Sequence, residues 1–472
     1  MNRIKTDICI IGAGSGGLSL AAGAVQMGAK VVLVEGAEMG GDCLNAGCIP
    51  SKALIAAAKH AHAMTSGAAF GVTPVVPQVD FAAAKDHVER VIATIAPLDS
   101  VERFEGLGVR VIKAWGRFIS PTELEAGGHI ITARRFVVAT GSRPLVPPIP
   151  GADTVPYLTN ETIFKLREKP EHLVIIGGGP IGMEMAQAHH RLGCRVTVIE
   201  GSKAFGRDDP ETAAVVLARL RAEGVQILED APVSGLARTD AGVVVTIKDG
   251  RSVTGSHLLM AVGRAVALDR LNLDAAGVAH TRKGVTVGAD LRSSNRRVYA
   301  VGDAAGGLQF THMAGYHSGV VIRSILFGLP SKMKTSHIPW ATYTDPELAQ
   351  VGMTEAEAHK AHGAALTVVR HTYHHNDRAQ AEGKTEGLIK VMVVRGRPVG
   401  ASIAGAQAGE LIGLWALVLS SRLKMSAVAG MVAPYPTLGE VSKRVAGAYF
   451  SPKLFDNPLV KRVVGLVQRY IP

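Results

Sequence analysis

The sequence predicts an α/β protein that ends in a separate α+β domain, because one motif occurs twice and the pattern then changes. The segments DICIIGAGSGGLSLAAGAVQMGAKVVLVEG and LVIIGGGPIGMEMAQAHHRLGCRVTVIEG both predict a strand, a glycine-rich turn, a helix and a second strand. Past residue ~340, GLIKVMVVRGRPVGASIAG predicts a hairpin of strands, and helices are expected over residues ~408–450. We therefore expect two Rossmann-like dinucleotide-binding domains followed by an α+β domain.

Each copy of the motif carries a complete dinucleotide fingerprint. The first glycine makes a tight turn, the second lets a pyrophosphate approach the backbone at a helix N-terminus, and the third lets the helix pack closely on the strand. An acidic residue about 20 positions on accepts hydrogen bonds from ribose hydroxyls. These positions are Gly12, Gly14, Gly17 and Glu35 in the first copy and Gly177, Gly179, Gly182 and Glu200 in the second. Two sites in one chain indicate a flavin dinucleotide and a nicotinamide dinucleotide.

The two copies and the loop signals between them divide the chain. The first glycines are 177 − 12 = 165 residues apart, and PLVPPIPG at 144–151 marks a boundary. We expect the first part of a flavin-binding domain, a nicotinamide-binding domain, a second part of the flavin-binding domain and a C-terminal domain. Their expected ranges are 1–150, 151–268, 269–338 and 339–472.

Composition excludes several other classes of protein. Hydrophobic residues make up 47% of the 472 residues and charged residues 19%, so the chain has enough apolar material for large cores. The net charge of +11 suits anionic dinucleotides, and because no basic stripe with interleaved aromatics occurs, nucleic-acid binding is not expected. Four cysteines do not form a disulfide scaffold, and the sequence shows neither a secretory signal nor an apolar run of ~18–20 residues. We expect a cytoplasmic protein.

Two cysteines with four residues between them occur in GGDCLNAGCIPSKAL, just past the first glycine-rich turn. Cys43 and Cys48 precede a predicted helix, whose N-terminus would lower the pKa of a thiol. A redox-active disulfide beside a flavin explains this placement, since the dithiol could then reduce an acceptor by thiol–disulfide exchange. The alternatives are two unrelated buried thiols or a metal site, and no metal site is expected from the histidine pairs. Cys9 and Cys194 are expected to be core thiols.

GGDCLNAGCIPSKAL closely resembles the active-site motif of the class I flavoprotein pyridine nucleotide-disulfide oxidoreductases. That family includes dihydrolipoamide dehydrogenase, glutathione reductase and mercuric reductase. The segments ATGSRP, AVGR, VYAVGDAAGGLQFTHMA, TDPELAQVGMTEAEA and YPTLGE resemble family segments in family order, so the resemblance covers essentially the whole chain. It implies FAD and NAD(P)H as cofactors and a homodimer formed by the C-terminal domain.

The resemblance also implies roles for single residues. Cys48 would face the flavin, and Cys43 would be the interchange thiol that meets the acceptor. Lys52 would approach the flavin and pair with Glu184 of the second motif. The further cofactor-binding positions that it implies are Gly41, Thr140, Gly141, Gly263, Asp303 and Ala314.

One position departs from the disulfide-reducing members of the family. Those members carry His-Pro-x-x-x-Glu in the C-terminal domain, whereas this chain has Tyr435, Pro436 and Glu440 in those places. An imidazole returns protons near neutrality, but a phenol with a pKa near 10 is a poor base. Mercuric reductases also carry a tyrosine near this site, although the vicinal cysteines and the N-terminal CxxC domain of full mercuric reductases do not occur in this sequence.

The expected function is therefore mercuric-reductase-like. Electrons would pass from NAD(P)H through Cys43 and Cys48 to a disulfide, a polysulfide or a soft metal ion. Glu200 favours NADH, because a carboxylate repels a 2′-phosphate, whereas Lys203 and Arg207 leave NADPH open. Two alternatives are a dihydrolipoamide-dehydrogenase-like protein that serves a lipoyl carrier or a membrane partner, and an NADH or quinone oxidoreductase with redox-silent cysteines.

The C-terminal segment 456–472 predicts a basic amphipathic helix. Lys461, Arg462 and Arg469 fall on one face of this helix, and Leu459 and the valines fall mostly on the other. Such a helix either makes peripheral contact with a membrane or packs on the protein or its dimer mate.

Overall fold

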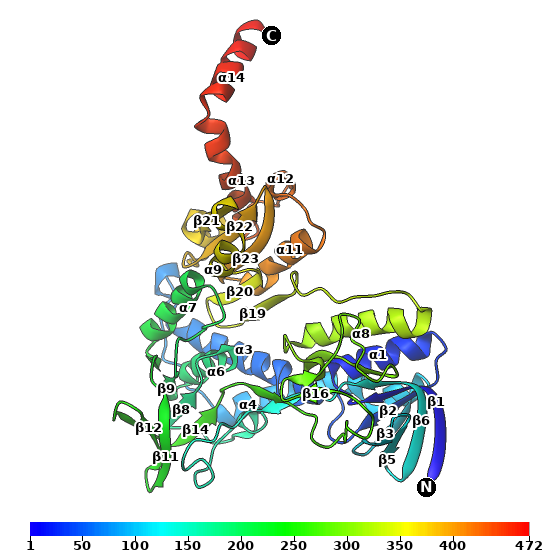
Figure 1. Ribbon diagram of the computed structural model, residues 1–472. Coiled ribbons are helices and arrows are strands. Elements are labelled where there is room, and N and C mark those ends of the chain that lie inside the picture. The colour runs from blue at the N-terminus through cyan, green and yellow to red at the C-terminus, as the bar shows by residue number, and fades with distance from the viewer. Residues whose placement is uncertain (472) are drawn as a thin grey trace. The chain divides into compact units, whose positions relative to one another are not determined.

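The computed structural model describes residues 1–471, and its backbone forms two compact units (Figure 1). The first unit contains Met1–Ser66, Pro74–Gly201 and Ala231–Lys334. The second contains Gly67–Thr73, Ser202–Asp230 and the chain from Thr335 onward. The predicted fold class is confirmed, and the finer domain boundaries stay a prediction.

The first unit is built on a seven-stranded sheet around β1 (Asn2–Ile11). The order is β3-β2-β1-β6-β5-β4, and β18 also pairs with β6. β1 runs parallel to β2 and β6, whereas β5 runs antiparallel to β6. Ile8 and Ile10 enter one core and Cys9 and Ile11 another, so both faces of the sheet are covered. The other strands are β2 (Val31–Glu35), β3 (Arg110–Lys113), β4 (Arg117–Ser120), β5 (Glu123–Ala126), β6 (His129–Val138) and β18 (Val298–Ala300).

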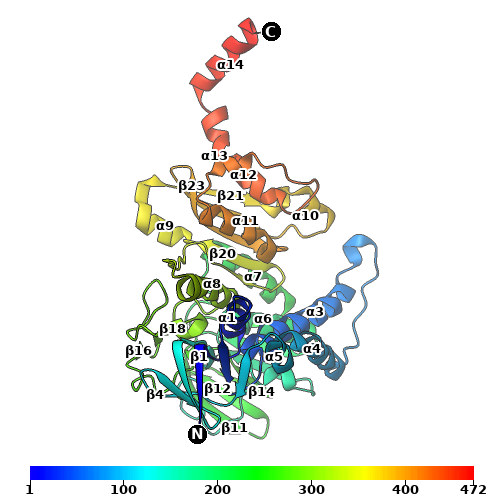
Figure 2. The ribbon, with the colours of Figure 1, turned by 90° about the vertical axis from the view of Figure 1, so that its right-hand side faces the viewer.

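Helices α1 (Ser15–Gln26) and α8 (Thr311–Phe327) lie side by side against this sheet (Figures 1 and 2). The two helices pack closely, since a Cβ on Gly23 of α1 would lie 2.6 Å from Cδ1 of Ile322 of α8. A Cβ on Gly16 would lie 3.3 Å from Cβ of Ala314, so the N-terminal turns of α1 and α8 are also adjacent. The other helices of this part are α2 (Gly41–Asn45), α3 (Cys48–Thr65), α4 (Phe81–Ile95), α5 (Val101–Gly106) and the 3₁₀ turns η2 (Ala96–Asp99), η3 (Ile163–Lys165) and η4 (Gly302–Ala305).

The second glycine-rich motif forms a parallel sheet of its own. β8 (His172–Ile176) lies between β9 (Arg195–Ile199) and β14 (His257–Met260), and α6 (Pro180–Arg191) connects β8 to β9. Both motifs therefore form the predicted strand, turn, helix and strand. The remaining strands are β7 (Ser142–Pro144), β11 (Val233–Thr239), β12 (Gly242–Ile247), β13 (Ser252–Gly255), β15 (Arg264–Val266), β16 (His280–Thr281) and β17 (Gly284–Val285).

The second unit contains a five-stranded antiparallel sheet in the order β19-β20-β23-β22-β21. The predicted hairpin is confirmed as β22 (Leu388–Val394) and β23 (Arg397–Gly405). Trp415 of α11 is fully buried in the core of this unit. The other strands of this sheet are β19 (Pro339–Thr342), β20 (Glu347–Gly352) and β21 (Leu366–Thr372), and β10 (Gln226–Leu228) lies outside it. The helices are α7 (Pro210–Glu223), α9 (Glu355–His362), α10 (Asp377–Ala381), α11 (Ala408–Ser420), α12 (Met425–Ala429), α13 (Glu440–Phe455), α14 (Pro458–Tyr470) and the turns η1 (Ala68–Phe70), η5 (Gly363–Ala365) and η6 (Tyr373–His375).

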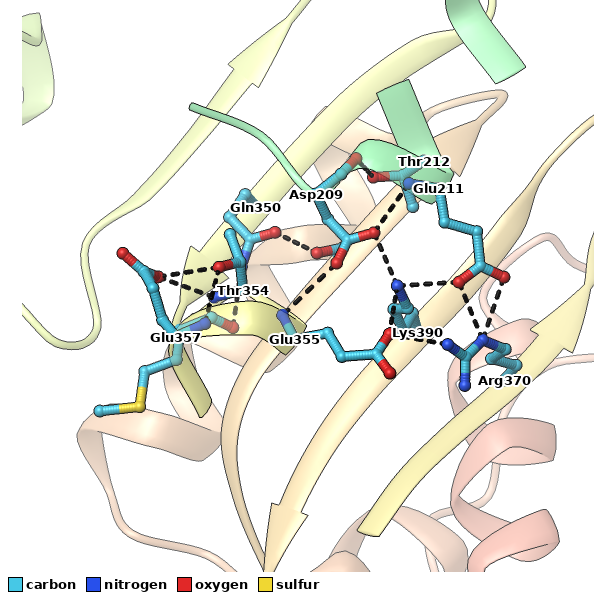
Figure 3. Close-up of polar contacts among 11 residues, drawn as sticks. Asp209, Glu211, Thr212, Gln350, Thr354, Glu355, Glu357, Arg370 and Lys390 are labelled. Atoms are coloured by element: carbon cyan, nitrogen blue, oxygen red, sulfur yellow. Dashed lines mark hydrogen bonds and ion pairs between the residues drawn. The ribbon is translucent and has the colours of Figure 1, made fainter. Parts of the chain in front are cut away.

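A buried ion cluster joins α7 to this sheet (Figure 3). Nζ of Lys390 lies 2.7 Å from Asp209, 2.8 Å from Glu211 and 2.6 Å from Glu355, and Arg370 also binds both glutamates. The side chains of Lys390 and Asp209 are 2% and 0% exposed. Because a buried charge without a partner is costly, these residues fix the position of α7 on β22.

Candidate active site

The first glycine-rich turn leaves no room for side chains at two of its glycines. Gly12 has φ of +109°, and a Cβ there would lie 2.4 Å from the carbonyl oxygen of Ala139. A Cβ on Gly17 would lie 1.9 Å from the carbonyl oxygen of Gly12. The carboxylate of Glu35 accepts hydrogen bonds from the backbone N–H of Ala13 at 2.5 Å and from Ala37 at 2.6 Å. The turn and its acidic residue therefore form one rigid unit at the end of β1.

The second turn repeats this geometry. Gly177 has φ of +115°, and its Cβ would lie 2.3 Å from the carbonyl oxygen of Ala261. A Cβ on Gly182 would lie 2.0 Å from the carbonyl oxygen of Gly177. The N–H of Gly178 donates to Oε2 of Glu200 at 2.7 Å. Gly179 directly precedes α6, and a Cβ there would have no described atom within 4 Å, so its backbone is open to a ligand.

Residues beside the first turn fit a flavin dinucleotide. Gly14 directly precedes α1, and a Cβ on Gly41 would lie 2.8 Å from Cα of Gly14, so the two backbones approach without side chains between them. The hydroxyl of Thr140 is buried and has no hydrogen-bond partner within residues 1–471. Gly141 follows it with φ of +65°. A backbone-lined gap and a buried hydroxyl able to bond a ligand match what a bound pyrophosphate-containing cofactor requires.

Asp303 belongs to a polar network that the sequence analysis only partly identified. Its carboxylate accepts a hydrogen bond from Oγ of Ser142 at 2.5 Å, and Arg264 donates to the same Oγ at 2.7 Å. Arg264 also lies 3.2 Å from Asp42. Burial raises the pKa of Asp303, and the Ser142 hydrogen bond partly offsets this effect. Ser142 and Arg264 follow the predicted Gly141 and Gly263 directly, and pairing of β7 with β15 brings them together.

The two cysteines lie together at the junction of two helices. Cys43 belongs to α2 and Cys48 is the first residue of α3, and both are free thiols. A hydrogen bond between them lowers the pKa of Cys48 to about 6 and raises that of Cys43. The hydroxyl of Thr311, at the start of α8, lies 3.4 Å from the sulfur of Cys48. Cys48 is therefore the sulfur that carries negative charge near neutral pH.

A cation lies beside this thiolate. Nζ of Lys52 forms an ion pair with Oε2 of Glu184 at 2.8 Å, as the family resemblance implied, and links α3 to α6. The side chain of Glu184 is 6% exposed. The charge of Lys52 lowers the pKa of Cys48 and that of Glu184 raises it. Glu184 thus holds Lys52 in place at a small cost to thiolate stability.

In the second unit, Tyr435 and Glu440 do not bond to each other. The hydroxyl of Tyr435 donates to Oδ2 of Asp377 at 3.0 Å, and this hydrogen bond raises the pKa of Tyr435. Arg444 lies 3.6 Å from Asp377 and 4.0 Å from Oε1 of Glu440. Oε2 of Glu440 is buried and has no hydrogen-bond partner among the described residues. We call Tyr435, Asp377, Arg444 and Glu440 the Tyr435 group, in which the sequence analysis missed Asp377 and Arg444.

Comparison with known proteins shows the family of the chain. Residues 6–318 match the family described as pyridine nucleotide-disulphide oxidoreductase, and residues 338–446 match the dimerisation domain of that family. The chain belongs to this family. It is therefore an FAD-dependent oxidoreductase with NAD(P)H as electron donor, and the dimerisation domain supports a homodimer.

Several family members resemble the chain over nearly its full length. Mercuric reductase from Streptomyces lividans is 32% identical over 94% of this chain and 96% of its own length. Dihydrolipoyl dehydrogenase from Geobacillus stearothermophilus is 31% identical over 94% and 96%. The Cu(II) complex of the HOCl-induced flavoprotein disulfide reductase RclA from Escherichia coli has a TM-score of 0.84 at 28% identity, covering 94% of this chain and 99% of that one. LpdA from Mycobacterium tuberculosis has a TM-score of 0.86 at 26% identity over 95% and 99%.

Proposed function

We propose that this chain is an NADH-dependent flavoprotein reductase that passes electrons through Cys43 and Cys48 to a soft metal ion, and less efficiently to a small disulfide or polysulfide. The observation that carries the proposal is the hydrogen-bonded cysteine pair beside the Lys52–Glu184 ion pair. A bound flavin supplies the two-electron chemistry between the dinucleotide and the sulfurs.

The roles of the two sulfurs follow from their pKa shifts. Cys48, with its pKa lowered to about 6, is the thiolate that Lys52 stabilises. Cys43, with its pKa raised, is the thiol that exchanges with the acceptor once it loses its proton. With a disulfide RSSR, Cys43 first forms a mixed disulfide and releases one RSH. Attack by Cys48 then closes the Cys43–Cys48 bond and releases the second RSH, so two electrons and two protons leave the dithiol.

The Tyr435 group supports a metal acceptor over a disulfide. Each thiol that a disulfide acceptor releases must take up a proton, which an imidazole near neutrality provides. The Tyr435 phenol instead donates to Asp377, which raises its pKa and makes it a poorer acid and base at neutral pH. A soft metal ion bound by thiolates needs no such proton: Hg(II) and NADH give Hg(0), NAD⁺ and one H⁺. The names of the mercuric reductases and of the RclA copper complex support this acceptor class.

Two features support NADH over NADPH. The Glu200 carboxylate is held by the second glycine-rich turn, where it would repel a 2′-phosphate. Lys203, the nearest basic residue along the chain, is already in an ion pair with Asp230 at 2.5 Å. We expect kcat/KM to favour NADH by about tenfold or more. A tenfold preference for NADPH would contradict this assignment.

The proposal is tested with purified enzyme, NADH and separate acceptors: Hg(II), Cu(II), lipoamide, oxidised glutathione, a polysulfide and a quinone. We expect turnover of the metal ions, which Cys43→Ser abolishes, whereas Cys194→Ala, which removes a core thiol, retains it. A higher turnover rate with lipoamide than with the metal ions would favour the dihydrolipoamide-dehydrogenase alternative. Quinone turnover unchanged by Cys43→Ser would favour the alternative with silent cysteines.

Two further parts of the proposal concern location. We place the enzyme in a reducing compartment, the cytoplasm, where the dithiol form persists. We also propose peripheral membrane contact through the C-terminal helix.

A further inference from the structure

Helix α14 (Pro458–Tyr470) presents an exposed apolar face. None of its residues is buried, and its large apolar side chains other than the partly covered Val460 expose between 43% and 70% of their surface. Their spacing of three and four residues places them on one face of the helix. These side chains are Leu459, Val463, Val464, Leu466, Val467 and Tyr470.

The opposite face of α14 carries only positive charge. Lys461, Arg462 and Arg469 lie there with Gln468, and residues 457–471 contain no aspartate or glutamate. Apolar residues and basic residues thus occupy separate sides of one short helix. This is the pattern of helices that lie in a membrane interface with their basic side toward anionic headgroups.

The helix is a well-formed element rather than an extension of α13. Asn457 caps it by accepting a hydrogen bond from the N–H of Leu459 at 3.0 Å, and Pro458 occupies its first turn. Figures 1 and 2 show α14 extending past the sheet and helices of its own unit. It also begins beyond residue 446, where the match to the family's dimerisation domain ends. The matched dimerisation domain therefore does not account for its apolar face.

We propose that α14 is a docking helix that binds this enzyme to the surface of an anionic phospholipid bilayer. The apolar side chains enter the boundary between headgroups and acyl chains, Tyr470 lies at headgroup level, and the three basic side chains contact anionic headgroups. Thirteen residues span about 20 Å, which is shorter than the ~30 Å hydrocarbon core, so the helix lies along the surface. In agreement, none of the helices among residues 1–471 is long and apolar enough to cross a bilayer.

Charge decides between a bilayer and a second copy of the chain. Two α14 helices packed by their apolar faces would leave both basic faces turned outward, with no carboxylate on either helix to bind them. The net charge of the whole chain is also +11, so an anionic surface attracts it.

The test is flotation of the full-length holoenzyme with vesicles of phosphatidylcholine alone or mixed with phosphatidylglycerol. We expect binding to the anionic vesicles, weakened by high salt, and about tenfold weaker binding to neutral ones. The triple variant Lys461→Glu, Arg462→Glu, Arg469→Glu should lose this binding. The matched control Arg282→Glu, Lys283→Glu, Arg296→Glu, which makes the same charge change on exposed residues elsewhere, should keep it.

Two further measurements separate lipid binding from self-association. In Tyr470→Trp, tryptophan emission should shift to shorter wavelength with anionic vesicles alone. Truncation after Phe455 should abolish flotation while the dimer mass by light scattering and the NADH-driven turnover stay unchanged. Equal binding by the triple variant and its control, unchanged flotation after truncation, or a dimer that dissociates on truncation would each overturn the proposal.

Discussion

The cysteine pair and the Tyr435 group each place an ionisable side chain beside a charged neighbour, yet the neighbours act in opposite directions. In the first unit, the hydrogen bond with Cys43 and, to a smaller extent, the charge of Lys52 lower the pKa of Cys48 to about 6. In the second unit, the carboxylate of Asp377 raises the pKa of Tyr435. One site therefore makes the reactive anion available at neutral pH, whereas the other keeps its phenol protonated.

This difference indicates whether the electron acceptor needs a proton from the protein. The sulfur site forms the Cys48 thiolate by itself and needs no base from the second unit for that step. The Tyr435 group offers a hydrogen-bond donor and a buried Glu440 oxygen that no described residue bonds, instead of an imidazole. An acceptor that binds thiolates and requires no returned proton suits this combination better than one that does.

The largest expected effect follows from removing the Cys48 thiolate at the sulfur site. In Cys48→Ser, NADH-driven reduction of the acceptor should fall by about 10³-fold or more, because no thiolate remains to close the disulfide. Steady-state rates with Hg(II) as the acceptor measure this. Cys9→Ala removes a core thiol as the control, and a Cys48→Ser rate within a few-fold of the parent rate would contradict the relay.

Lys390→Met separates the stability of the second unit from its chemistry. It leaves Asp209, which is 0% exposed, without its 2.7 Å partner, so the free energy of unfolding should fall by about 3–5 kcal/mol. Denaturant unfolding monitored by tryptophan fluorescence measures this change. The acceptor preference of the folded variant should match that of the parent enzyme. A loss below about 1 kcal/mol would show that the ion cluster does not stabilise this unit.

Tyr435→His converts the second site toward the proton-donating type. An imidazole in place of the phenol, in the same group as the buried Glu440 carboxylate, should raise disulfide turnover near neutral pH by about tenfold. Turnover of the metal ion should change little. Tyr435→Phe is the control, and an equal rise in both variants would attribute the effect to loss of the hydroxyl instead of gain of a base.

The smallest expected effects test how the charges of Lys52 and Glu184 change the pKa of Cys48. Lys52→Met should move the pH midpoint of Cys48 alkylation upward from about 6, because the thiolate loses its cation. Glu184→Gln should move the midpoint downward, because that carboxylate disfavours the thiolate. Iodoacetamide rates measured against pH report both shifts, with Lys59→Met on the same helix as the control. Shifts of the same sign would contradict the assigned roles.

Features set by short spacings could be predicted from the sequence. The glycine-rich turns follow from steric limits on neighbouring backbone atoms, and the paired cysteines lie within one motif. Contacts between distant segments could not be predicted this way. Asp377 meets Tyr435 across 58 residues, and Ser142 meets Asp303 across 161, because sheet pairing and helix docking bring them together. The break that places Cys43 on α2 and Cys48 on α3 also has no signal in residue spacing.

Differential alkylation with mass spectrometry tests the central claim most directly. The oxidised holoenzyme is sampled under anaerobic conditions before NADH, after one equivalent of NADH and after one further equivalent of Hg(II). We predict that the peptide containing Cys43 and Cys48 is protected as a disulfide at first and becomes alkylated at both sulfurs after NADH. It should return to the disulfide once the electron pair has passed to the metal and Hg(0) has left. The account would be contradicted if the acceptor were still reduced while the alkylation of both sulfurs stayed the same at all three stages.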